Sequence, residues 1–490
     1  MLNYLDVKVA KTTEKFDSAL LFLCKECKAF LKADFLPKNG QNVLNAYLEK
    51  EKDFFKTGKI GKVTYLEGKE LKQILVAGCG EGKQCTAVNF RKVAGCAARA
   101  LRDNKCEKVL VAAPILLKPD NGRYLEAVVQ GLYLGAYDYD EYKTGTAKKT
   151  VIKISVATKV KSATAVVKKA AVVAEAVSFS RNLINKPGNE VYPEIMAKYA
   201  EQVAKENHLQ IEVLDEKKLK AKKMNAILAV GQGSVHKPRM IVLKYNGAGK
   251  APYTAYVGKG ITFDSGGISI KPTEGMGEMK DDMSGAADVL GAMKAIAALK
   301  LKMNLIVVMA CAENMPGGNA QRPGDIVKAA SGKTIEVITT DAEGRMVLAD
   351  AVWYACQLGA KKVVDIATLT GAVIIALGKE TAGIVANDDA LAADVIKAGK
   401  FTGESYWQLP AYPEYFELIK SPVADLKNSG GRAGGCITGG LFIGEFIDKG
   451  VAWAHLDIGG TSSADKTAGF KPLGGTAFGV MTLVKLGELE

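Results

Sequence analysis

Histidine is scarce in this chain, with three residues among 490. So few imidazoles disfavour a histidine-rich metal site and a Ser-His-Asp triad, because both depend on that side chain. Long apolar runs are also missing, since the apolar segment 19–23 is far too short to cross a membrane. Residues 1–17 carry charges throughout and do not resemble a secretory signal. We therefore expect a cytoplasmic protein that does not enter a membrane.

The cysteines lack the pattern of a zinc ribbon or finger. Nine occur, and Cys24 and Cys27 form a single C-x-x-C pair with no second pair and no histidine nearby. Such motifs normally need four ligands, so a zinc or redox role for this pair is disfavoured. Reduced thiols, as in cytosolic proteins, are the preferred interpretation.

Nucleotide-binding motifs are missing as well. Gly78, Gly80 and Gly82 follow a predicted strand and precede a predicted helix, but their spacing is G-x-G-x-G. The dinucleotide pattern is G-x-G-x-x-G, and no Walker lysine motif occurs. A phosphate-binding loop is therefore disfavoured at this position.

Positive charge is in excess, with a formal net charge of +13. A basic run can bind nucleic acid, but this one lacks the interleaved aromatic residues that stack on bases. We favour a solvated face over nucleic-acid binding. The run has no acidic residue before Glu175 and consists of Lys143, Lys148, Lys149, Lys153, Lys159, Lys161, Lys168 and Lys169.

The composition, 48% hydrophobic and 24% charged, predicts a globular chain, and 490 residues allow two or three domains. Strand-like and helix-like segments alternate, which predicts the α/β class. We expect two domains, each with a central mostly parallel or mixed sheet flanked by helices, joined by a long helix. The expected boundaries are 1–165, 166–186 for the linking helix, and 187–490. Predicted strands include 72–77, 108–113, 151–157, 210–214, 239–245, 253–257, 305–312, 335–339 and 363–366, and predicted helices include 87–101, 124–134, 195–206, 284–299 and 350–357.

Charged residues gather in two glycine-rich stretches, VGKGITFDSGGISIKPTEGMGEMKDDMSGAA at 257–287 and TDAEGR at 340–345. Four carboxylates cannot share a pocket without cations, because like charges at short range repel strongly in a low dielectric. Two divalent metals would balance them, and oxygen ligands suit Mg, Mn and Zn. The two stretches supply Lys259, Asp264, Lys271, Asp282, Asp341, Glu343 and Arg345.

The spacing predicts where these side chains lie. Asp341, Glu343 and Arg345 are two residues apart, so an extended segment would point all three to one side. They follow predicted strand 335–339, and Lys259 follows predicted strand 253–257. We expect the ligands at the carboxyl ends of two strands, where open α/β sheets place their sites. A glycine-rich turn with solvated charges is the alternative, but it leaves Asp282 and the separate Asp-x-Glu-x-Arg unexplained.

These segments resemble the leucyl aminopeptidase family, the two-metal cytosol aminopeptidases. The match covers about residues 180–485 and includes VGKGITFDSGGISIKP, MKDDMSGAA, ENMPGGNAQRPGD, TDAEGR, DIATLTGA and WAHLDIGG. The resemblance implies a metal-dependent aminopeptidase that hydrolyses the N-terminal peptide bond of peptides and prefers leucine or other apolar residues. The sequence departs from the family pattern at Thr339, Met346 and Gly439-Gly440, none of which is an expected ligand.

The resemblance also implies the role of each site residue. Two divalent ions per subunit, Zn and/or Mn with Mg as an alternative, would share a bridging water that acts as the nucleophile. Lys259 would be a neutral amine, because adjacent dications lower the pKa of an amine. Lys271 would stabilise the oxyanion. One ion would be held by Lys259, Asp264, Asp282 and Glu343, and the other by Asp264, Asp341 and Glu343.

Proton transfer needs a further group, since the carboxylates are used as ligands and Arg345 stays charged. The resemblance implies a bicarbonate that acts as general base, held by Arg345 with Leu369 and Gly371 beside it. Met279, Thr368 and Gly371 would line the pocket for the first side chain of the peptide. A methionine in that pocket favours apolar residues.

The resemblance implies a homohexamer that acts on peptides. Two other classes are alternatives: a nucleic-acid-binding protein that uses the lysine run, and a two-metal phosphoesterase. The second is disfavoured because Lys271 and Arg345 match the peptidase pattern in order and spacing. His455, with apolar neighbours, is predicted to be a buried, hydrogen-bonded structural residue.

Overall fold

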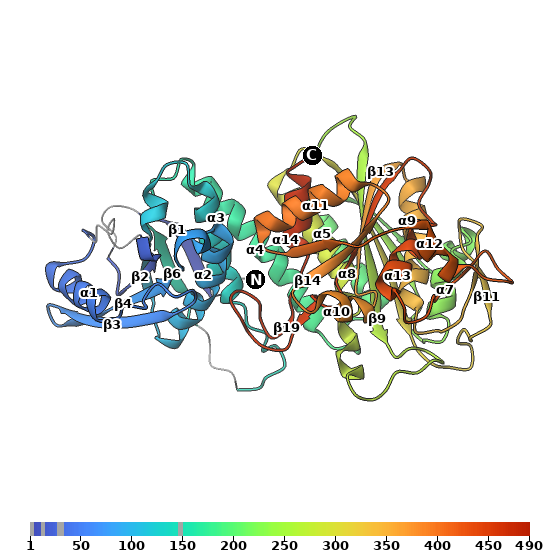
Figure 1. Cartoon of the computed structure of the whole chain (residues 1–490), viewed down its shortest axis with the longest axis horizontal. Helices are drawn as coiled ribbons and strands as arrows, with labels where there is room; N and C mark the ends of the chain where they lie inside the picture. Colours follow the sequence, from blue (N-terminus) through green and yellow to red (C-terminus); the bar gives the residue numbers. More distant parts are fainter. Residues whose placement is uncertain (1–3, 11–14, 27–33, 146–149) are drawn as a thin grey trace. The chain divides into compact units, whose positions relative to one another are not determined.

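The computed structural model describes residues 4–10, 15–26, 34–145 and 150–490. Cys27 of the C-x-x-C pair and Lys148 and Lys149 of the lysine run lie outside these residues. The chain forms two compact units, Met1–Ser178 with Asp465–Leu473, and Phe179–Ala464 with Gly474–Glu490 (Figure 1). The division falls inside helix α4 (Ala163–Asn185).

The first unit is built on a six-stranded sheet of order β1-β6-β5-β2-β4-β3. All neighbouring pairs are parallel except β3 and β4. Strand β2 is buried at every position, as expected for a parallel strand covered on both faces. The strands are β1 (Leu5–Val9), β2 (Ser18–Leu23), β3 (Ile60–Glu67), β4 (Glu70–Gly78), β5 (Lys108–Ala112) and β6 (Ile152–Val156), and the helices are α1 (Lys38–Lys50), α2 (Ala87–Asp103) and α3 (Gly122–Gly135).

The second unit is built on an eight-stranded mixed sheet of order β15-β14-β17-β13-β9-β10-β8-β7. Its centre, β17-β13-β9-β10, is parallel, so the carboxyl ends of these four strands meet at one edge. The strands are β7 (Gln210–Leu214), β8 (Arg239–Asn246), β9 (Tyr253–Asp264), β10 (Asn304–Asn314), β13 (Ala360–Ala367), β14 (Thr381–Ala386), β15 (Ser405–Gln408) and β17 (Ala452–Asp457). The predicted fold class is confirmed.

Helices cover both faces of this sheet. On one face α8 (Ser284–Leu299) packs on β9, β10 and β13, and α14 (Val480–Gly487) and α5 (Pro193–Asn207) pack against α8. On the other face α9 (Glu343–Gln357) packs on the same three strands, flanked by α7 (Asn225–Gly231) and α13 (Gly435–Gly444). Among the described residues, no helix is both long enough and apolar enough to span a membrane.

Two local predictions are wrong. Strand 253–257 continues to Asp264, so Lys259 lies within β9 rather than after it. The predicted strand 335–339 shrinks to β12 (Thr334–Glu336), which belongs to a small separate sheet with β11 (Ile326–Lys328) and β16 (Leu426–Lys427). Beyond β12, the side chain of Asn428 takes the backbone bonds that a strand would use: Oδ1 accepts from Ile338 N at 2.8 Å, and Nδ2 donates to Thr339 O at 2.7 Å.

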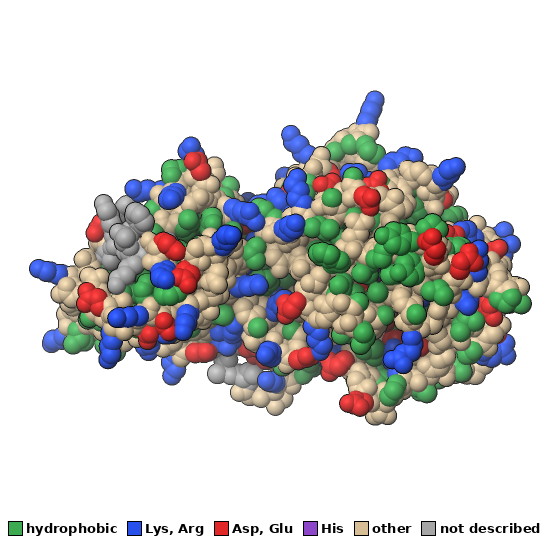
Figure 2. Space-filling model, viewed as in Figure 1, with side chains coloured by type: hydrophobic (Ala, Val, Ile, Leu, Met, Phe, Trp, Pro, Cys, Tyr) green, Lys and Arg blue, Asp and Glu red, His purple; other side chains and the backbone are tan. Residues whose placement is uncertain are grey.

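The described lysines of the basic run are mostly exposed. Two of them meet carboxylates, with Lys161 Nζ 3.7 Å from Asp120 Oδ1 and Lys169 Nζ 3.4 Å from Glu126 Oε1. Figure 2 shows Lys and Arg side chains dispersed over the visible face, with acidic side chains among them. The exposed members of the run are Lys143, Lys153, Lys159, Lys161 and Lys168.

Candidate metal centre

Strand β9 supplies two of the predicted ligands, Lys259 and Asp264, each with 2% of its surface exposed. Side chains alternate along a strand, so Gly258 and Lys259 face opposite sides of the sheet. Gly258 lies against α8, where an added Cβ would be 2.5 Å from Gly285 O. Lys259 points to the opposite side, toward α9, and Gly344 of that helix lies against its side chain.

Lys259 brings three segments together. Its Nζ lies 2.7 Å from Asp282 Oδ1, 2.9 Å from Glu343 Oε1 and 2.8 Å from the Thr368 carbonyl oxygen. Burial by itself lowers the pKa of this amine, but the surrounding carboxylates more than offset that effect. The pKa of Lys259 is therefore raised, and the amine is an ammonium in this arrangement.

Lys271 joins the other two predicted ligands. Its Nζ lies 2.8 Å from Asp264 Oδ2 and 2.7 Å from Asp341 Oδ1. A tight turn returns the chain to this point: Gly266 has a φ of 84°, and Lys271 N donates to Ser265 O at 2.9 Å. Burial lowers the pKa of Lys271, while Asp264 and Asp341 raise it by more, so the net pKa is raised.

Four carboxylates gather around only two lysines, so the lysines cannot neutralise all of the negative charge. Asp264, Asp341 and Glu343 each offer an oxygen within 4.8 Å of the others. Asp282 Oδ2 and Glu343 Oε2 are buried without a hydrogen-bond partner among the described residues. Burial raises the pKa of Asp282 and of Glu343, and the neighbouring carboxylates raise both further, so that the pKa values stay raised although Lys259 lowers them. Buried oxygens without donors, in a cluster of hard ligands, fit divalent cations.

Two polar residues outside the predicted set hold the cluster in place. Asn314, at the end of β10, donates from Nδ2 to Asp264 Oδ1 at 2.8 Å and to Thr340 O at 3.0 Å. Thr340 Oγ1 donates to Gly266 O at 2.6 Å and accepts from Ser269 N at 2.8 Å. These bonds tie the loop that carries Asp341 to the end of β9. The sequence signal for Asn314 is a lone amide at the end of a long apolar strand.

The expectation that Asp341, Glu343 and Arg345 point to one side is wrong. Glu343 begins α9, and positions i and i+2 of a helix do not share a face. Glu343 reaches Lys259, whereas Arg345 lies against Gly439, where an added Cβ would be 3.2 Å from Arg345 Nη2. Arg345 Nε is buried and has no hydrogen-bond partner among the described residues. Burial lowers the pKa of this guanidinium, which still remains charged.

The segment after β13 borders both the carboxylate cluster and Arg345. Thr368 Oγ1 donates to Asp282 Oδ1 at 2.7 Å, so Thr368 touches the cluster. Leu369 also lies against Gly439, 3.1 Å from the position of an added Cβ. Leu369 and Arg345 therefore meet at the same glycine.

Asp457, at the end of β17, positions this segment. Its Oδ1 accepts from Leu369 N at 3.3 Å and Thr370 N at 3.4 Å, and its Oδ2 accepts from Thr370 Oγ1 at 2.6 Å. Gly371 follows as the exposed residue before α10 (Ala372–Leu377). Asp457 was not among the predicted site residues, because its role depends on the pairing of β17 with β13.

The remaining predicted residues lie at the margin of the cluster or away from it. Met279 is half-buried in the 3₁₀ helix η4 (Met276–Asp281), which leads directly into Asp282. His455 is fully buried, and its Nδ1 lies 2.6 Å from Asp365 Oδ1. The prediction of a buried, hydrogen-bonded histidine is confirmed.

The fold and this cluster define an α/β protein with a centre of carboxylates and lysines suited to divalent cations, buried except at Asp341 and the half-buried Lys271. Family models match both units: the catalytic domain of the cytosol aminopeptidase family over residues 178–484, and the N-terminal domain of that family over residues 24–146. The chain belongs to the cytosol aminopeptidase family and is an aminopeptidase, a hydrolase of peptides. The resemblance found in the sequence is confirmed.

Similar proteins agree over most of the chain. A "Probable cytosol aminopeptidase" of Geotalea uraniireducens (strain Rf4) is 43% identical over 440 residues, which cover 88% of each chain. One of Clostridium perfringens (strain 13 / Type A) is 37% identical over 495 residues and 99% of each chain. The solved structure of the bottromycin maturation enzyme BotP in complex with Mn has a TM-score of 0.87 at 31% identity and covers 97% of this chain and 99% of that one. A mutant of tomato leucine aminopeptidase has the same TM-score and identity, with 99% and 96% coverage.

Proposed function

We propose that this aminopeptidase removes leucine or another apolar residue from the N-terminus of peptides with the aid of two divalent metal ions. The observation that carries the proposal is the pair of buried oxygens without donors, Asp282 Oδ2 and Glu343 Oε2, inside a cluster of four acids. Such oxygens are costly to bury unless a hydrogen-bond donor, a proton or a cation satisfies them, and the gathering of four acids at one place favours cations. The metal ligands would be Lys259, Asp264, Asp282, Asp341 and Glu343.

The ligand set suits Mn and Zn, because it combines carboxylate oxygens with one amine nitrogen. The manganese named for the similar BotP structure supports Mn. Bound ions of this kind polarise a carbonyl group and lower the pKa of water. Lys259 can join them only as a neutral amine, so its raised pKa must fall when dications enter the cluster.

The two lysines would then do different work. Lys259 is 3% exposed at its side chain and is enclosed by Asp282 and Glu343. Lys271 is 22% exposed at its side chain, so it borders the space that a substrate can reach. As an ammonium, Lys271 can stabilise the negative charge that develops on the carbonyl oxygen of the scissile bond.

Arg345 is proposed to hold the bicarbonate that acts as general base, with Leu369 and Gly371 beside it. Support comes from the buried Arg345 Nε, which lacks a partner among the described residues, and from the contact of both Arg345 and Leu369 with Gly439. A planar guanidinium fork suits a planar oxyanion. Proton transfer would therefore take place beside Arg345 on α9 and the segment after β13.

The pocket for the first side chain of the peptide is proposed at Met279, Thr368 and Gly371. Gly371 has open space around the position of an added Cβ, and Met279 and Thr368 are each half-buried. A flexible, polarizable methionine suits apolar side chains of several shapes. This supports a preference for leucine and related residues.

Assembly and location are proposed from the family resemblance. We propose a homohexamer in the cytoplasm, and native mass spectrometry of the purified chain tests the first part. A single mass six times that of the chain is expected, and a monomer at micromolar concentration would contradict it. Nucleic-acid binding by the lysine run stays the less favoured prediction.

Hydrolysis of aminoacyl amides tests the function. After exhaustive chelation, cleavage of leucyl amide should be lost, and Mn or Zn should restore it. Leucyl amide should be cleaved faster than aspartyl or lysyl amide. Removal of bicarbonate from the buffer should slow the wild-type chain but not Arg345→Ala, which has already lost that contribution. Full activity after chelation would contradict the proposal.

A further inference from the structure

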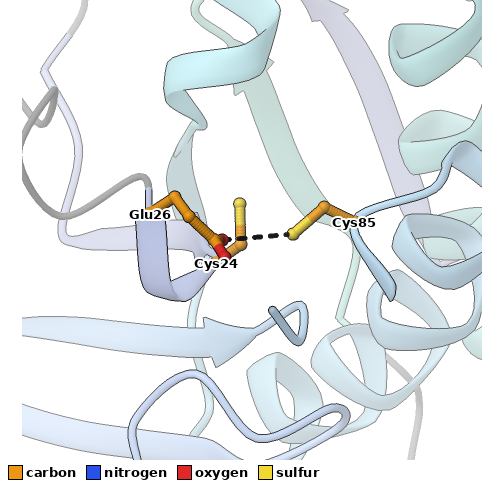
Figure 3. A group of neighbouring side chains, drawn as sticks. All are labelled: Cys24, Glu26 and Cys85. Atoms are coloured by element: carbon orange, nitrogen blue, oxygen red, sulfur yellow. Dashed lines mark hydrogen bonds between the residues drawn. The ribbon is translucent and has the colours of Figure 1, made fainter. Parts of the chain in front are cut away.

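The first unit carries a second group of potential metal ligands, which the aminopeptidase reaction does not use. Strands β2 and β4 are parallel neighbours, so the loops after their carboxyl ends lie side by side. Cys24 and Glu26 follow β2, and Cys85 follows β4. Figure 3 shows the Cys85 thiol and the Glu26 carboxylate facing each other, with the Cys24 side chain beside them.

The three side chains are close enough to share one ion. The Sγ atoms of Cys24 and Cys85 and an oxygen of Glu26 all lie within 4.8 Å of one another. Cys85 Sγ is 3.8 Å from Glu26 Oε2, and Glu26 Oε1 accepts from Gly82 N at 2.8 Å. The hydrogen bond from Gly82 N to Glu26 Oε1 holds the carboxylate so that its other oxygen, Oε2, faces the Cys85 thiol.

Backbone bonds hold the two loops together. Cys79 N donates to Leu23 O at 2.8 Å, and Lys25 N donates to Gly80 O at 3.1 Å. Lys25 Nζ forms an ion pair with Glu81 Oε2 at 2.6 Å. The convergence of the three ligands is therefore set by four contacts between the loops, the Glu26–Gly82 bond included.

The donor set selects the kind of ion. Two sulfurs with one carboxylate oxygen favour a thiophilic divalent cation such as Zn²⁺ over Mg²⁺ or Ca²⁺. Cys24 is 4% exposed, Cys85 is half-buried and Glu26 is exposed, so an ion can enter from solvent and keep a water as its fourth ligand.

We propose that Cys24, Glu26 and Cys85 form a zinc site in the first unit. Binding releases the two thiol protons to solvent and leaves a Zn²⁺ coordinated by two thiolates and one carboxylate. The site goes beyond the proposed aminopeptidase function, whose ligands are all oxygen and nitrogen. A disulfide between Cys24 and Cys85 is the competing use of the same pair, and the experiment below separates the two.

Cobalt substitution of the full chain under reducing conditions tests the site. Thiolate ligands give Co²⁺ a sulfur-to-metal charge-transfer absorption in the near ultraviolet, which the sulfur-free catalytic cluster cannot produce. The wild-type chain should show this absorption, and Cys24→Ser and Cys85→Ser should lose it. Cys106→Ser, which changes a buried cysteine of the same unit, should keep it. Asp341→Asn should also keep it, so failure of the catalytic proposal would not affect this result.

Zinc content gives a second readout. The wild-type chain should retain one more zinc per chain than Cys24→Ser. Because Glu26 is exposed, Glu26→Gln should fold normally yet weaken zinc binding by at least about tenfold, since even the loss of a hydrogen-bond partner of a metal ligand usually costs about that much. Equal zinc content in wild type and Cys24→Ser, or no charge-transfer absorption in the wild-type chain, would overturn the proposal. A Cys24–Cys85 disulfide that persists in the presence of reductant would also overturn the proposal. Mass spectrometry would detect it as a chain two hydrogens lighter than expected.

Discussion

In the second unit, the buried acids Asp282 and Glu343 of the candidate metal centre differ from the buried Asp350 in what their oxygens contact. In the metal centre, Asp282 and Glu343 each keep one oxygen without a donor among the described residues. By contrast, Asp350 on α9 accepts from Ala330 N at 2.8 Å through Oδ1, and from Ala226 N and Ile227 N at 2.9 and 3.0 Å through Oδ2. Asp282, Glu343 and Asp350 are all buried, so burial alone does not distinguish them. The oxygens without donors do.

Asp288 limits this rule. Both of its oxygens lack a hydrogen-bond partner among the described residues, yet it is a single acid on α8. Burial raises its pKa well above the usual range, and its charged neighbours are Glu404 and Arg181. A lone buried carboxyl can escape the cost of burial by holding a proton. We propose that four acids gathered around two lysines, as at Lys259 and Lys271, bind cations instead.

The largest expected effect comes from Glu343→Gln. The substitution keeps the shape of the side chain but removes a charge from the centre of the cluster. Hydrolysis of leucyl amide should fall by about 10³-fold or more, at least the upper end of the cost of losing one oxyanion donor. The metal content of the purified chain should fall as well, while the melting temperature should stay within a few degrees. Wild-type activity in this variant would contradict its role as a ligand.

The next largest effects come from substitutions of the two lysines, which should differ in their effect on metal content. Lys271→Met should lower kcat by about 10²-fold, because the ammonium proposed to stabilise developing charge is lost, and should keep its full metal content. Lys259→Met removes a proposed ligand and should lower metal content as well as kcat. Metal analysis beside steady-state kinetics checks the difference. If both variants keep all their metal, Lys259 is not a ligand.

A smaller effect is expected from Gly344→Ala. An added Cβ would lie 2.5 Å from Lys259 Cε and 2.7 Å from Lys259 Nζ, so the amine must move. A displacement of this size should cost about tenfold in kcat/KM, within the range known for misplaced catalytic groups. Gly318→Ala is the matched control, because nothing lies within 4 Å of its added Cβ. Equal activity of the two variants would show that the position of Lys259 is not critical.

The smallest effect on activity belongs to Asp350→Asn. An amide nitrogen cannot accept a hydrogen bond, so one or two of the three buried N–H donors would lose their acceptor. The free energy of unfolding should drop by about 1–3 kcal/mol, while kcat/KM at 25 °C stays within about twofold of wild type. Denaturant titration and kinetics check the two parts. A large loss of activity in the folded variant would place Asp350 in the chemistry and weaken the comparison.

Much of the fold could be predicted from the sequence because local signals were consistent. Strand 210–214 and helix 284–299 match β7 and α8 at both ends. The predicted boundaries of β9 and α9 were wrong because glycine and charged residues interrupt the apolar pattern at the proposed site. Gly258 and Gly260 interrupt the apolar run of β9, yet the strand continues because α8 packs closely on Gly258. The start of α9 at Glu343 was hidden by its polar first turn.

The proposed ligand residues could be selected from the sequence because their types and order match a known family, and their role as metal ligands stays a prediction. Their supporting residues could not, because those roles depend on contacts between distant segments. Asn314 joins Asp264 to Thr340, and Asp457 holds the backbone after β13. Cys85 meets Cys24 only because β2 and β4 are neighbours, although 61 residues separate the two cysteines along the chain.

The most direct test of the central claim is anomalous scattering from crystals of the full chain soaked in manganese. The account predicts two peaks among the carboxylates of Asp264, Asp282, Asp341 and Glu343, with Lys259 Nζ in contact with one of them. No peak in this cluster, with Lys259 and Lys271 still bonded to the same carboxylates, would contradict it.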